Sequence, residues 1–333
     1  MELIAGTKVL ITGGTGFTGS VLTKKLVALG LDVRVIARAS SDITSFEGLS
    51  IEWFRGDNFD KEIVQKACKD VEYIFNVAAA YREAKLKEED YHNVHVLGTK
   101  LLAEEALKQK EFKRFIHIST IGVHGDIKNP PADEESPFNP GDIYQNTKAD
   151  AEKWLHSFAS ENNLEYTVIR PVAIYGPSDK RLLKLFKMAK LGIYPILGYG
   201  KSLYHLIHVD DLTDIIIKAA TFLKAKNEVF IAGNPESASI EGIGRIVASV
   251  YNKKLYIIKM PAWPFFLMGM LCELICRPLQ IEPPIYRRRV AFYTKDRSFD
   301  TSKLMNVLEY KTRYSNKQGL EETVGWYQKH SWL

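Results

Sequence analysis

A glycine-rich segment near the amino terminus limits the fold of this chain more than any other feature. Residues 12–19 read TGGTGFTG, and they join a short apolar run to an amphipathic stretch at residues 18–29. In a turn between a strand and a helix, Gly13 permits the tight bend, Gly16 lets the backbone approach a pyrophosphate, and Gly19 allows close helix–sheet packing. The N–H groups at the start of the helix then attract phosphate groups. The segment therefore predicts a dinucleotide-binding turn.

Short β-rich runs alternate with amphipathic helical stretches through the first half of the chain. The expected strands are residues 8–12, 33–37, 51–54, 73–77, 114–119 and 167–170, and the expected helices are residues 18–29, 61–69, 91–110 and 144–162. Such alternation favours an α/β fold with a doubly wound parallel sheet. After Pro171 the chain becomes helix-rich and proline-studded, with one more apolar strand at 229–232. We predict a dinucleotide-binding domain over residues 1–171, with late returns near 206–232, and a smaller, helix-rich substrate-binding region over residues 172–333.

The composition narrows the class of protein. Apolar residues make up 46% and charged residues 26% of the 333 residues, which is typical of a globular protein. The net charge is +5 without a long basic run, so we expect no nucleic-acid partner. The 3 cysteines form neither a disulfide framework nor a metal-ligand pattern, which favours a reducing compartment and no bound metal. Because the chain also lacks a signal-like amino terminus and an apolar stretch of about 20 residues, we predict a cytoplasmic protein.

The end of the second expected strand indicates which dinucleotide binds. About 20 residues beyond a glycine loop, an acidic residue would bind the ribose 2′-hydroxyl of NAD. This chain has Arg38 there, and a guanidinium matches a 2′-phosphate, which favours NADP. NAD remains the alternative if Arg38 only stacks on the adenine. Asp57 and Asn58 follow the third strand near the adenine, whereas Ala78 and Ala79 follow the fourth strand and are small enough to admit the ribose.

A tyrosine and a lysine at helical spacing form the candidate catalytic pair. Tyr144 and Lys148 are 4 residues apart, so they lie on one face of the expected helix. A phenol has a pKa of about 10, so it needs a neighbouring positive charge to act as a base near neutral pH. A hydroxyl at the end of the fifth strand, from Ser119 or Thr120, would complete the set. Tyr-x-x-x-Lys alone is common on solvated helices, but its place downstream of a glycine loop favours the catalytic interpretation.

These motifs together resemble the extended short-chain dehydrogenase/reductases, also called the NAD-dependent epimerase/dehydratase family. The resemblance covers nearly the whole chain, at residues 12–19, 56–57, 76–80, 119–125, 144–148, 169–177 and 207–212. It implies a Rossmann-type sheet, with Tyr144 as the acid/base and Lys148 bound to the nicotinamide ribose. It selects Thr120 as the catalytic hydroxyl, with Ser119 as its neighbour, and it implies that the Pro171–Val172 backbone meets the carboxamide.

The predicted cofactor contacts are Gly13, Gly16, Phe17, Thr18, Gly19, Arg38, Asp57, Asn58, Ala78, Ala79, Tyr144, Lys148, Pro171 and Val172. Two positions depart from the family pattern. His95 stands where the family often has Asn, and Tyr204 stands where nucleotide-sugar members commonly carry an Arg for the sugar diphosphate. His208 and Asp211 match the family, and we expect Asp211 to cap the helix that follows.

Segments near the carboxyl terminus resemble the 3β-hydroxysteroid and sterol dehydrogenase branch, at residues 289–294, 299–303 and 308–310. They are also similar to hopanoid-associated sugar epimerase-like proteins and, more loosely, to dihydroflavonol reductases. The stretch Met260–Cys272 is apolar on every face, so it is a buried core helix, a substrate lid or an interfacial membrane contact. Arg287–Arg289 would hold a diphosphate or form a solvated basic turn.

We therefore predict an NADP-dependent oxidoreductase that acts on a secondary alcohol or ketone of sterol type, with Tyr144 as the acid/base. NAD stays open as the coenzyme, and a nucleotide-sugar epimerase or dehydratase is the alternative function. The expected partner is a small-molecule substrate. A peripheral membrane contact through the carboxyl-terminal region and a homodimer both stay open.

Overall fold

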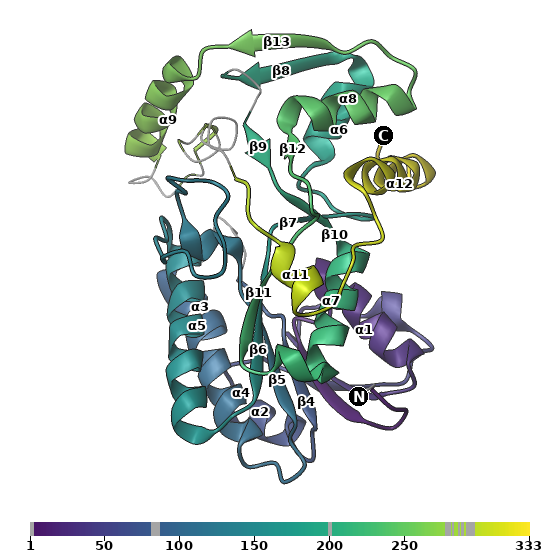
Figure 1. The fold of residues 1–333 in the computed structure, drawn as a ribbon, viewed down its shortest axis with the longest axis vertical. Helices are drawn as coiled ribbons and strands as arrows, with labels where there is room; N and C mark the ends of the chain where they lie inside the picture. The colour runs from purple at the N-terminus through teal and green to yellow at the C-terminus, as the bar shows by residue number, and fades with distance from the viewer. Residues whose placement is uncertain are drawn as a thin grey trace.

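The computed structural model describes residues 3–80, 87–198, 202–276, 281, 283–285, 287, 290 and 297–333. A parallel sheet with flanking helices forms the lower half of the molecule in Figure 1, and a smaller set of helices and short strands lies above it. Among the described residues, no helix combines the length and the apolar character needed to cross a membrane.

The main sheet has seven strands in the described part of the chain, in the order β11-β6-β5-β4-β1-β2-β3, with every neighbouring pair parallel. The strands are β1 (Lys8–Thr12), β2 (Asp32–Ala37), β3 (Ile51–Arg55), β4 (Tyr73–Asn76), β5 (Arg114–Ile118), β6 (Tyr166–Pro171) and β11 (Glu228–Ala232). The chain order reverses between β1 and β4, which makes the sheet doubly wound with its switch point there. The predicted α/β, Rossmann-type fold class is confirmed, and each predicted strand differs from the observed one by at most 1 residue at either end.

Helices cover both faces of this sheet. They are α1 (Phe17–Ala28), α2 (Lys61–Ala67), α3 (Glu88–His92), α4 (Gly98–Ala106), α5 (Ile143–Asn162), α7 (Val209–Thr221) and α11 (Ser302–Asn306), with short 3₁₀ helices η1 (Thr44–Phe46), η3 (Ile121–His124) and η4 (Leu223–Ala225). Successive strand residues point to opposite faces. In β1, Val9 and Ile11 therefore pack with α1 and α7, whereas Leu10 packs with α2, α4 and α5. This burial on both faces explains why the strands read as continuous apolar runs.

The helical segment before β5 differs from its prediction. The sequence predicted one helix over residues 91–110, but α3, a π-helical segment (Asn93–Leu97) and α4 follow one another over residues 88–106. The Asn58 side chain donates a hydrogen bond to the carbonyl of Val94 within the π-helical segment (2.9 Å). Gly98 leaves room for this contact, because a Cβ there would lie 2.2 Å from Asn58 Nδ2. Since the partner comes from the turn after β3, the helical periodicity alone could not indicate it.

The upper part of the molecule is built around a second apolar core, which includes Phe186, Tyr194 and Tyr327. Its helices are α6 (Leu183–Leu191), α8 (Ile240–Val250), α9 (Trp263–Cys276) and α12 (Asn316–Lys329), and its strand pairs are β7 (Ala173–Tyr175) with β10 (Leu206–His208), β8 (Ile193–Leu197) with β13 (Tyr256–Met260), and β9 (Leu203–Tyr204) with β12 (Ala238–Ser239). The sequence analysis missed these pairs, because four of the strands have only 2 or 3 residues and because β8 and β13 become strands only by pairing with each other. The domain division at residue 171 stays a prediction.

The apolar stretch Met260–Cys272 does not form a buried core helix. It makes up the end of β13 and most of α9, in which Trp263 is 70% and Leu271 is 47% exposed. Gly269 and Glu273 are the buried residues of α9. Because apolar side chains surround the whole helix, one small core can cover only one side of it. The buried-core alternative is therefore wrong.

Candidate active site

The predicted site residues lie at one edge of the main sheet. In a parallel sheet all carboxyl ends meet at the same edge, and ligands bind there beside the switch point. The glycine loop follows β1, Arg38 follows β2, Ala78 and Ala79 follow β4, Ser119 and Thr120 follow β5, and Pro171 ends β6. With neighbouring strands about 4.8 Å apart, three strand spacings place the ends of β2 and β5 roughly 15 Å apart. The candidate cofactor contacts therefore form a line along this edge.

The glycine loop packs closely against the segment that follows β4. A Cβ at Gly13 would lie 2.7 Å from Ala78 Cα, and a Cβ at Gly19 would lie 2.0 Å from the Gly13 carbonyl oxygen. Gly13 also has a φ of 69°, in the left-handed region that favours glycine. Both positions therefore require glycine, and the close approach lies directly at the switch point between β1 and β4.

The start of α1 offers donors to an anionic ligand. Gly16 is the N-cap and supplies no side-chain acceptor, and the first turn contains no acidic residue. The backbone N–H groups that begin with Phe17 and Thr18 are thus suited to a phosphate group. The Arg181 guanidinium, which is paired with the Asp179 carboxylate (2.7 Å), lies over the Phe17 ring with its Cζ 5.1 Å from the ring centroid. The start of α1 fits a pyrophosphate. The sequence did not indicate Arg181 beside it, because Arg181 lies in a distant segment of the chain.

Two arginines lie at the ends of β2 and β3. Arg38 is exposed and forms no ion pair with another described residue. Arg55 lies opposite Ala37 across the strand pair, and its guanidinium donates to the carbonyls of Ala39 (2.6 Å) and Ser41 (2.9 Å). Arg55 thereby holds the turn that carries Arg38 and brings a second positive charge to it. Sequence reasoning missed Arg55, because its contacts depend on strand pairing and not on a motif.

Asp57 and Asn58 lie in the turn between β3 and α2. Asp57 is partly exposed at this sheet edge, whereas Asn58 is 7% exposed and its side-chain nitrogen is engaged by Val94. Val172, just beyond β6, is also buried, and its N–H donates to the carbonyl of Ala232 (3.0 Å). The contacts of these residues with a cofactor stay predictions.

Lys148 is buried between the ends of two strands. The residue is 2% exposed, and Nζ donates to the carbonyl of Ile118 at the end of β5 (2.9 Å) and to that of Ala78 after β4 (3.3 Å). Burial lowers the pKa of Lys148 to about 8, against the opposing influence of the Glu152 charge. Through these two donated hydrogen bonds, the Lys148 side chain joins α5 to the loop at the switch point.

Tyr144 lies in the first turn of α5, and this turn contacts the segment that carries Thr120. Asp142 is the N-cap of α5, and its side chain accepts from the N–H of Gln145 (3.0 Å). Thr120 precedes η3, and its Oγ1 accepts from the N–H of Gly122 (3.0 Å). A Cβ at Gly122 would lie 3.1 Å from Gln145 Cγ, so η3 contacts the first turn of α5. Because its oxygen is the acceptor for Gly122, the Thr120 hydroxyl can donate its proton to a ligand.

Ser119, in contrast, belongs to a buried polar network. Its hydroxyl donates to Glu152, which is completely buried and also accepts from Arg170 Nε (2.9 Å) and a terminal Arg170 nitrogen (2.6 Å). His156 Nε2 lies 3.4 Å from the same carboxylate. Burial opposes ionisation of Glu152, but the hydrogen bonds from His156, Arg170 and Ser119, together with the Arg170 charge, hold its pKa at about 2. Because Ser119 gives its proton to Glu152, the geometry favours Thr120 of the two candidate hydroxyls.

His95 connects the loop after β4 to the start of α5. Its Nε2 accepts from the N–H of Ala80 (3.0 Å), its Nδ1 lies 2.8 Å from Thr147 Oγ1, and its ring stands edge-on to Tyr144 at 5.4 Å between centroids. Burial, followed by the positive charge of Lys148, lowers the pKa of His95 well below its usual value. The ring is therefore neutral, with its proton on Nδ1, and it packs beside the Tyr144 phenol.

The expectation that Asp211 caps α7 is wrong. His208 is the N-cap of this helix, and Asp211 lies within the first turn. The Asp211 carboxylate accepts from the Tyr310 hydroxyl (2.9 Å) and from the N–H of Arg313 (2.8 Å). It therefore holds the segment between α11 and α12 onto α7, a long-range contact that local spacing cannot reveal.

Of the basic turn Arg287–Arg289, the structure describes Arg287, whereas Arg288 and Arg289 lie outside the described residues. Residues 291–294, which carry part of the resemblance to the sterol dehydrogenase branch, also lie outside them. Arg287 is engaged by Glu273 of α9, with a terminal nitrogen 3.0 Å from the carboxylate. Tyr204 lies in β9, where it pairs with Ala238 of β12. Neither position presents an unpaired guanidinium to a sugar diphosphate.

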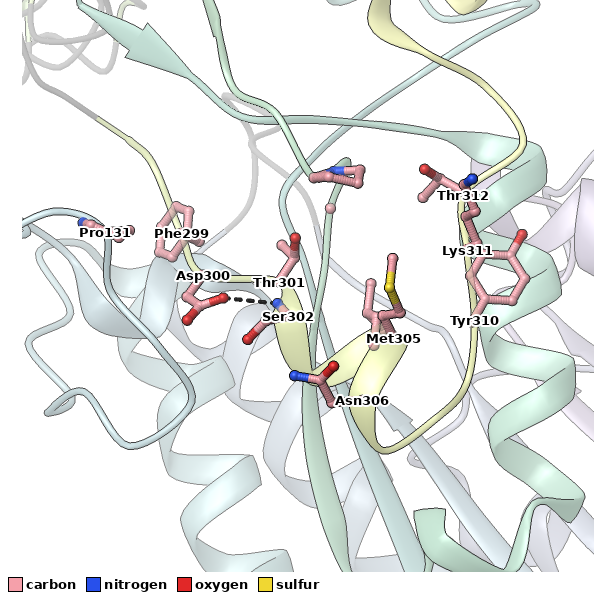
Figure 2. Close-up of a pocket in the computed structure, with 13 residues that line it drawn as sticks. Pro131, Phe299, Asp300, Thr301, Ser302, Met305, Asn306, Tyr310, Lys311 and Thr312 are labelled. Carbon is pink, nitrogen blue, oxygen red and sulfur yellow. Dashed lines mark hydrogen bonds between the residues drawn. The ribbon is translucent and has the colours of Figure 1, made fainter.

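A hollow of about 400 Å³ lies beside α11 (Figure 2). Thr301, Met305 and Tyr310 border it, and the Asp300 carboxylate accepts from the N–H of Ser302 (2.8 Å) at its rim. No predicted catalytic or cofactor-binding residue lines this hollow. Within the described residues, no cluster of His, Cys, Asp and Glu is arranged to hold a metal ion.

The sequence and the fold are similar to those of known enzymes. Residues 9–233 match the NAD dependent epimerase/dehydratase family. The chain is 30% identical to a UDP-glucose 4-epimerase of Vibrio cholerae, over 79% of this chain and 81% of that protein. It is 29% identical to the sterol-4-alpha-carboxylate 3-dehydrogenase of Candida albicans, over 96% of this chain and 97% of that protein. The UDP-glucose 4-epimerase structure of Thermotoga maritima shares the fold, with a TM-score of 0.78 at 22% identity, covering 98% of this chain and 100% of that one.

Proposed function

The chain belongs to the NAD dependent epimerase/dehydratase family, and on this basis we propose that it is an NADP-dependent oxidoreductase acting on a secondary alcohol or ketone. The placement of Lys148 carries the proposal. Its buried ammonium bridges the carbonyls of Ala78 and Ile118, and it shares a helix face with Tyr144. Burying an ammonium costs free energy, and the two carbonyls that accept from Lys148 offset only part of this cost. A charge kept at such a position indicates a functional role, which supports an enzyme over a binding module that only holds the dinucleotide.

Each residue of the site has one role in this proposal. A bound nicotinamide would supply or accept the hydride. Tyr144 moves the proton at the substrate oxygen, and the Thr120 hydroxyl donates a hydrogen bond to the same oxygen. The Lys148 ammonium favours the phenolate form of Tyr144 through its charge. His95 is neutral and packs edge-on to the phenol, so we assign it the positioning of the Tyr144 ring.

The two hydroxyls after β5 are expected to respond differently to substitution. Thr120→Ala should lower kcat by about 10²–10³-fold, because it removes a donor to the reacting oxygen, and Thr120→Ser should restore most of it. Ser119→Ala should leave kcat within a few-fold but lower the free energy of unfolding by about 1–3 kcal/mol, because Glu152 loses a buried donor. Steady-state kinetics and urea unfolding of the three variants measure both effects. A larger loss of kcat in Ser119→Ala than in Thr120→Ala would reverse the assignment.

The coenzyme preference is expected to depend on Arg38. A charge-assisted pair with the 2′-phosphate contributes about 1.5–3 kcal/mol, so Arg38→Ala should weaken NADP binding by about tenfold to a hundredfold. NAD has no 2′-phosphate, so its affinity should not change and serves as the internal control. Arg38→Lys should give an intermediate loss, because lysine keeps the charge but not the paired donors. Titration of both coenzymes tests this, and equal affinity of the wild type for both would rule out the NADP preference.

We further propose a lipophilic substrate of sterol type. The Candida albicans relative is a sterol-4-alpha-carboxylate 3-dehydrogenase, and it aligns over nearly the full length of both chains. Among the described residues, the positions expected to bind a diphosphate hold Tyr204 and Arg287, which is paired with Glu273, and this also favours a substrate without a diphosphate. The similarity to the Vibrio cholerae UDP-glucose 4-epimerase supports the alternative, a nucleotide-sugar epimerase or dehydratase.

A single assay separates these two functions. The purified protein is incubated with NADP and a panel of hydroxysteroids, and in parallel with UDP-sugars, while nicotinamide absorbance and products are followed. The proposal expects net coenzyme reduction with a hydroxysteroid and none with a sugar nucleotide. Interconversion of UDP-sugars without net reduction would establish the epimerase alternative, and Lys148→Met provides the inactive control for both arms.

A further inference from the structure

One surface of the upper part of the molecule is apolar and exposed. We call it the apolar face, and it comprises the outward side chains of β8, β13 and α9, with Ile193, Tyr256, Ile258, Trp263, Leu274 and Ile275 as its main residues. These elements lie together at the upper end of the view in Figure 1. The most exposed members are Trp263 at 70% and Leu274 at 71%. Exposed apolar side chains that gather on neighbouring elements are typical of a binding surface in a folded protein.

In the β8–β13 ribbon, the pairing of the two strands places apolar side chains on the exposed side. Tyr256 pairs with Ile193, and Ile258 pairs with Pro195, so these side chains share the outer side of the ribbon. The alternate residues Tyr194 and Ile196 are completely buried in the core below. A half-buried ribbon would normally carry polar residues on its outer side. Here the outer side is apolar as well.

The segments that form the apolar face carry positive charges, of which Lys259 of β13 is paired with Glu241 of α8 (3.5 Å). Residues 180–198 and 250–272 contain lysines but no Asp or Glu. Lys254 lies at the edge of the ribbon, with Nζ 5.6 Å from the centroid of the exposed Tyr256 ring. The one acidic residue of α9, Glu273, is buried and paired with Arg287. A lysine-rimmed apolar surface with Trp and Tyr at its edge has the pattern of an interfacial membrane contact.

We propose that the apolar face docks onto an anionic lipid surface, with α9 and the β8–β13 ribbon lying in the headgroup region. The 14 residues of α9 are too few to span a bilayer, so the helix would lie along the interface. A second copy of this chain is a poorer partner, because a symmetric contact would bring the lysine rims of both copies together. Anionic headgroups instead complement that rim.

Vesicle binding tests the proposal. The full chain is sedimented with vesicles of phosphatidylcholine alone, and with an equal mixture of phosphatidylcholine and phosphatidylglycerol, at low and high salt. We expect binding to the anionic vesicles that weakens as salt is raised. Leu274→Glu should weaken it by about tenfold to a hundredfold, the value of one buried leucine side chain. Lys254→Gln should weaken it by about fivefold, because each lysine near such a surface contributes about 1 kcal/mol.

Matched variants keep the test specific. Leu223 of η4 is 74% exposed in the other half of the molecule, so Leu223→Glu should bind vesicles like the wild type. Because Leu274 and Leu223 are both exposed, neither variant should lower the melting temperature. Absence of vesicle binding by the wild type, or equal binding by Leu274→Glu, would overturn the proposal. A wild-type dimer that Leu274→Glu converts to monomer in sedimentation equilibrium would assign the face to self-association and overturn it as well.

Discussion

Replacing Tyr144 with phenylalanine is expected to lower kcat by about 10²–10⁴-fold, the range that one acid/base group contributes. The change removes the hydroxyl that moves the proton and keeps the ring that stands edge-on to His95. Tyr144 is one of many predicted cofactor contacts, and Lys148 and the glycine loop are unchanged in the variant, so the affinity for the dinucleotide should fall by no more than a few-fold. Steady-state kinetics and coenzyme titration on one preparation measure the two quantities separately.

A second tyrosine provides the matched control for this variant. The Tyr166 hydroxyl lies 2.7 Å from His156 Nδ1, in the network behind the site, and it has no part in the proposed reaction. Tyr166→Phe should therefore retain kcat within a few-fold. If Tyr144→Phe turned over substrate as fast as Tyr166→Phe does, Tyr144 would not be the acid/base.

Replacing Glu152 with alanine is expected to lower the free energy of unfolding by about 3–5 kcal/mol, because the change leaves a buried guanidinium without its partner. Arg170 is 2% exposed, and two of its nitrogens donate to the Glu152 carboxylate. Glu161 lies on the same helix and is exposed, so Glu161→Ala should change stability by no more than about 0.5 kcal/mol. Urea unfolding of the two variants makes the comparison, and equal stability would show that the buried network contributes nothing.

The Glu152 carboxylate should also make the free energy of unfolding depend on pH. The pKa of Glu152 is held at about 2, below its usual value of 4.5. A lowered pKa in the folded state means that the stabilisation is fully present above pH 4.5 and is lost as the pH falls towards 2. The difference in unfolding free energy between wild type and Glu152→Gln should therefore shrink over this acid range. A difference that is constant with pH would contradict the ion pair.

The sequence was a good guide to the fold because its strongest signals are local. A continuous apolar run such as β1 and a glycine loop at its end each require one local geometry, and repeated along the first half of the chain the alternation predicted the doubly wound sheet. The short strands β8 and β13 were not predicted, because each becomes a strand only by pairing with the other, about 60 residues away. The exposure of α9 was also not predictable, since an evenly apolar helix gives no indication of which side is covered.

The residues of the candidate site also fall into those that the sequence predicts and those that it does not. Tyr144 and Lys148 are found by their spacing on one helix, whereas the choice between Ser119 and Thr120 depends on where the buried Glu152 lies. Arg55 reaches the turn at Arg38 only because β2 and β3 pair in parallel. The choice of hydroxyl and the position of Arg55 both depend on contacts between different elements, and the spacing of residues along the chain does not indicate such contacts.

Deuterium transfer tests the central claim most directly. The protein is given NADP and an alcohol that carries deuterium on the carbinol carbon, and the released coenzyme is analysed by mass spectrometry. The proposed function predicts that deuterated NADPH is released in an amount equal to the ketone formed, and that Tyr144→Phe releases almost none. Release of unlabelled coenzyme, or return of the label to the product carbon without free NADPH, would contradict it.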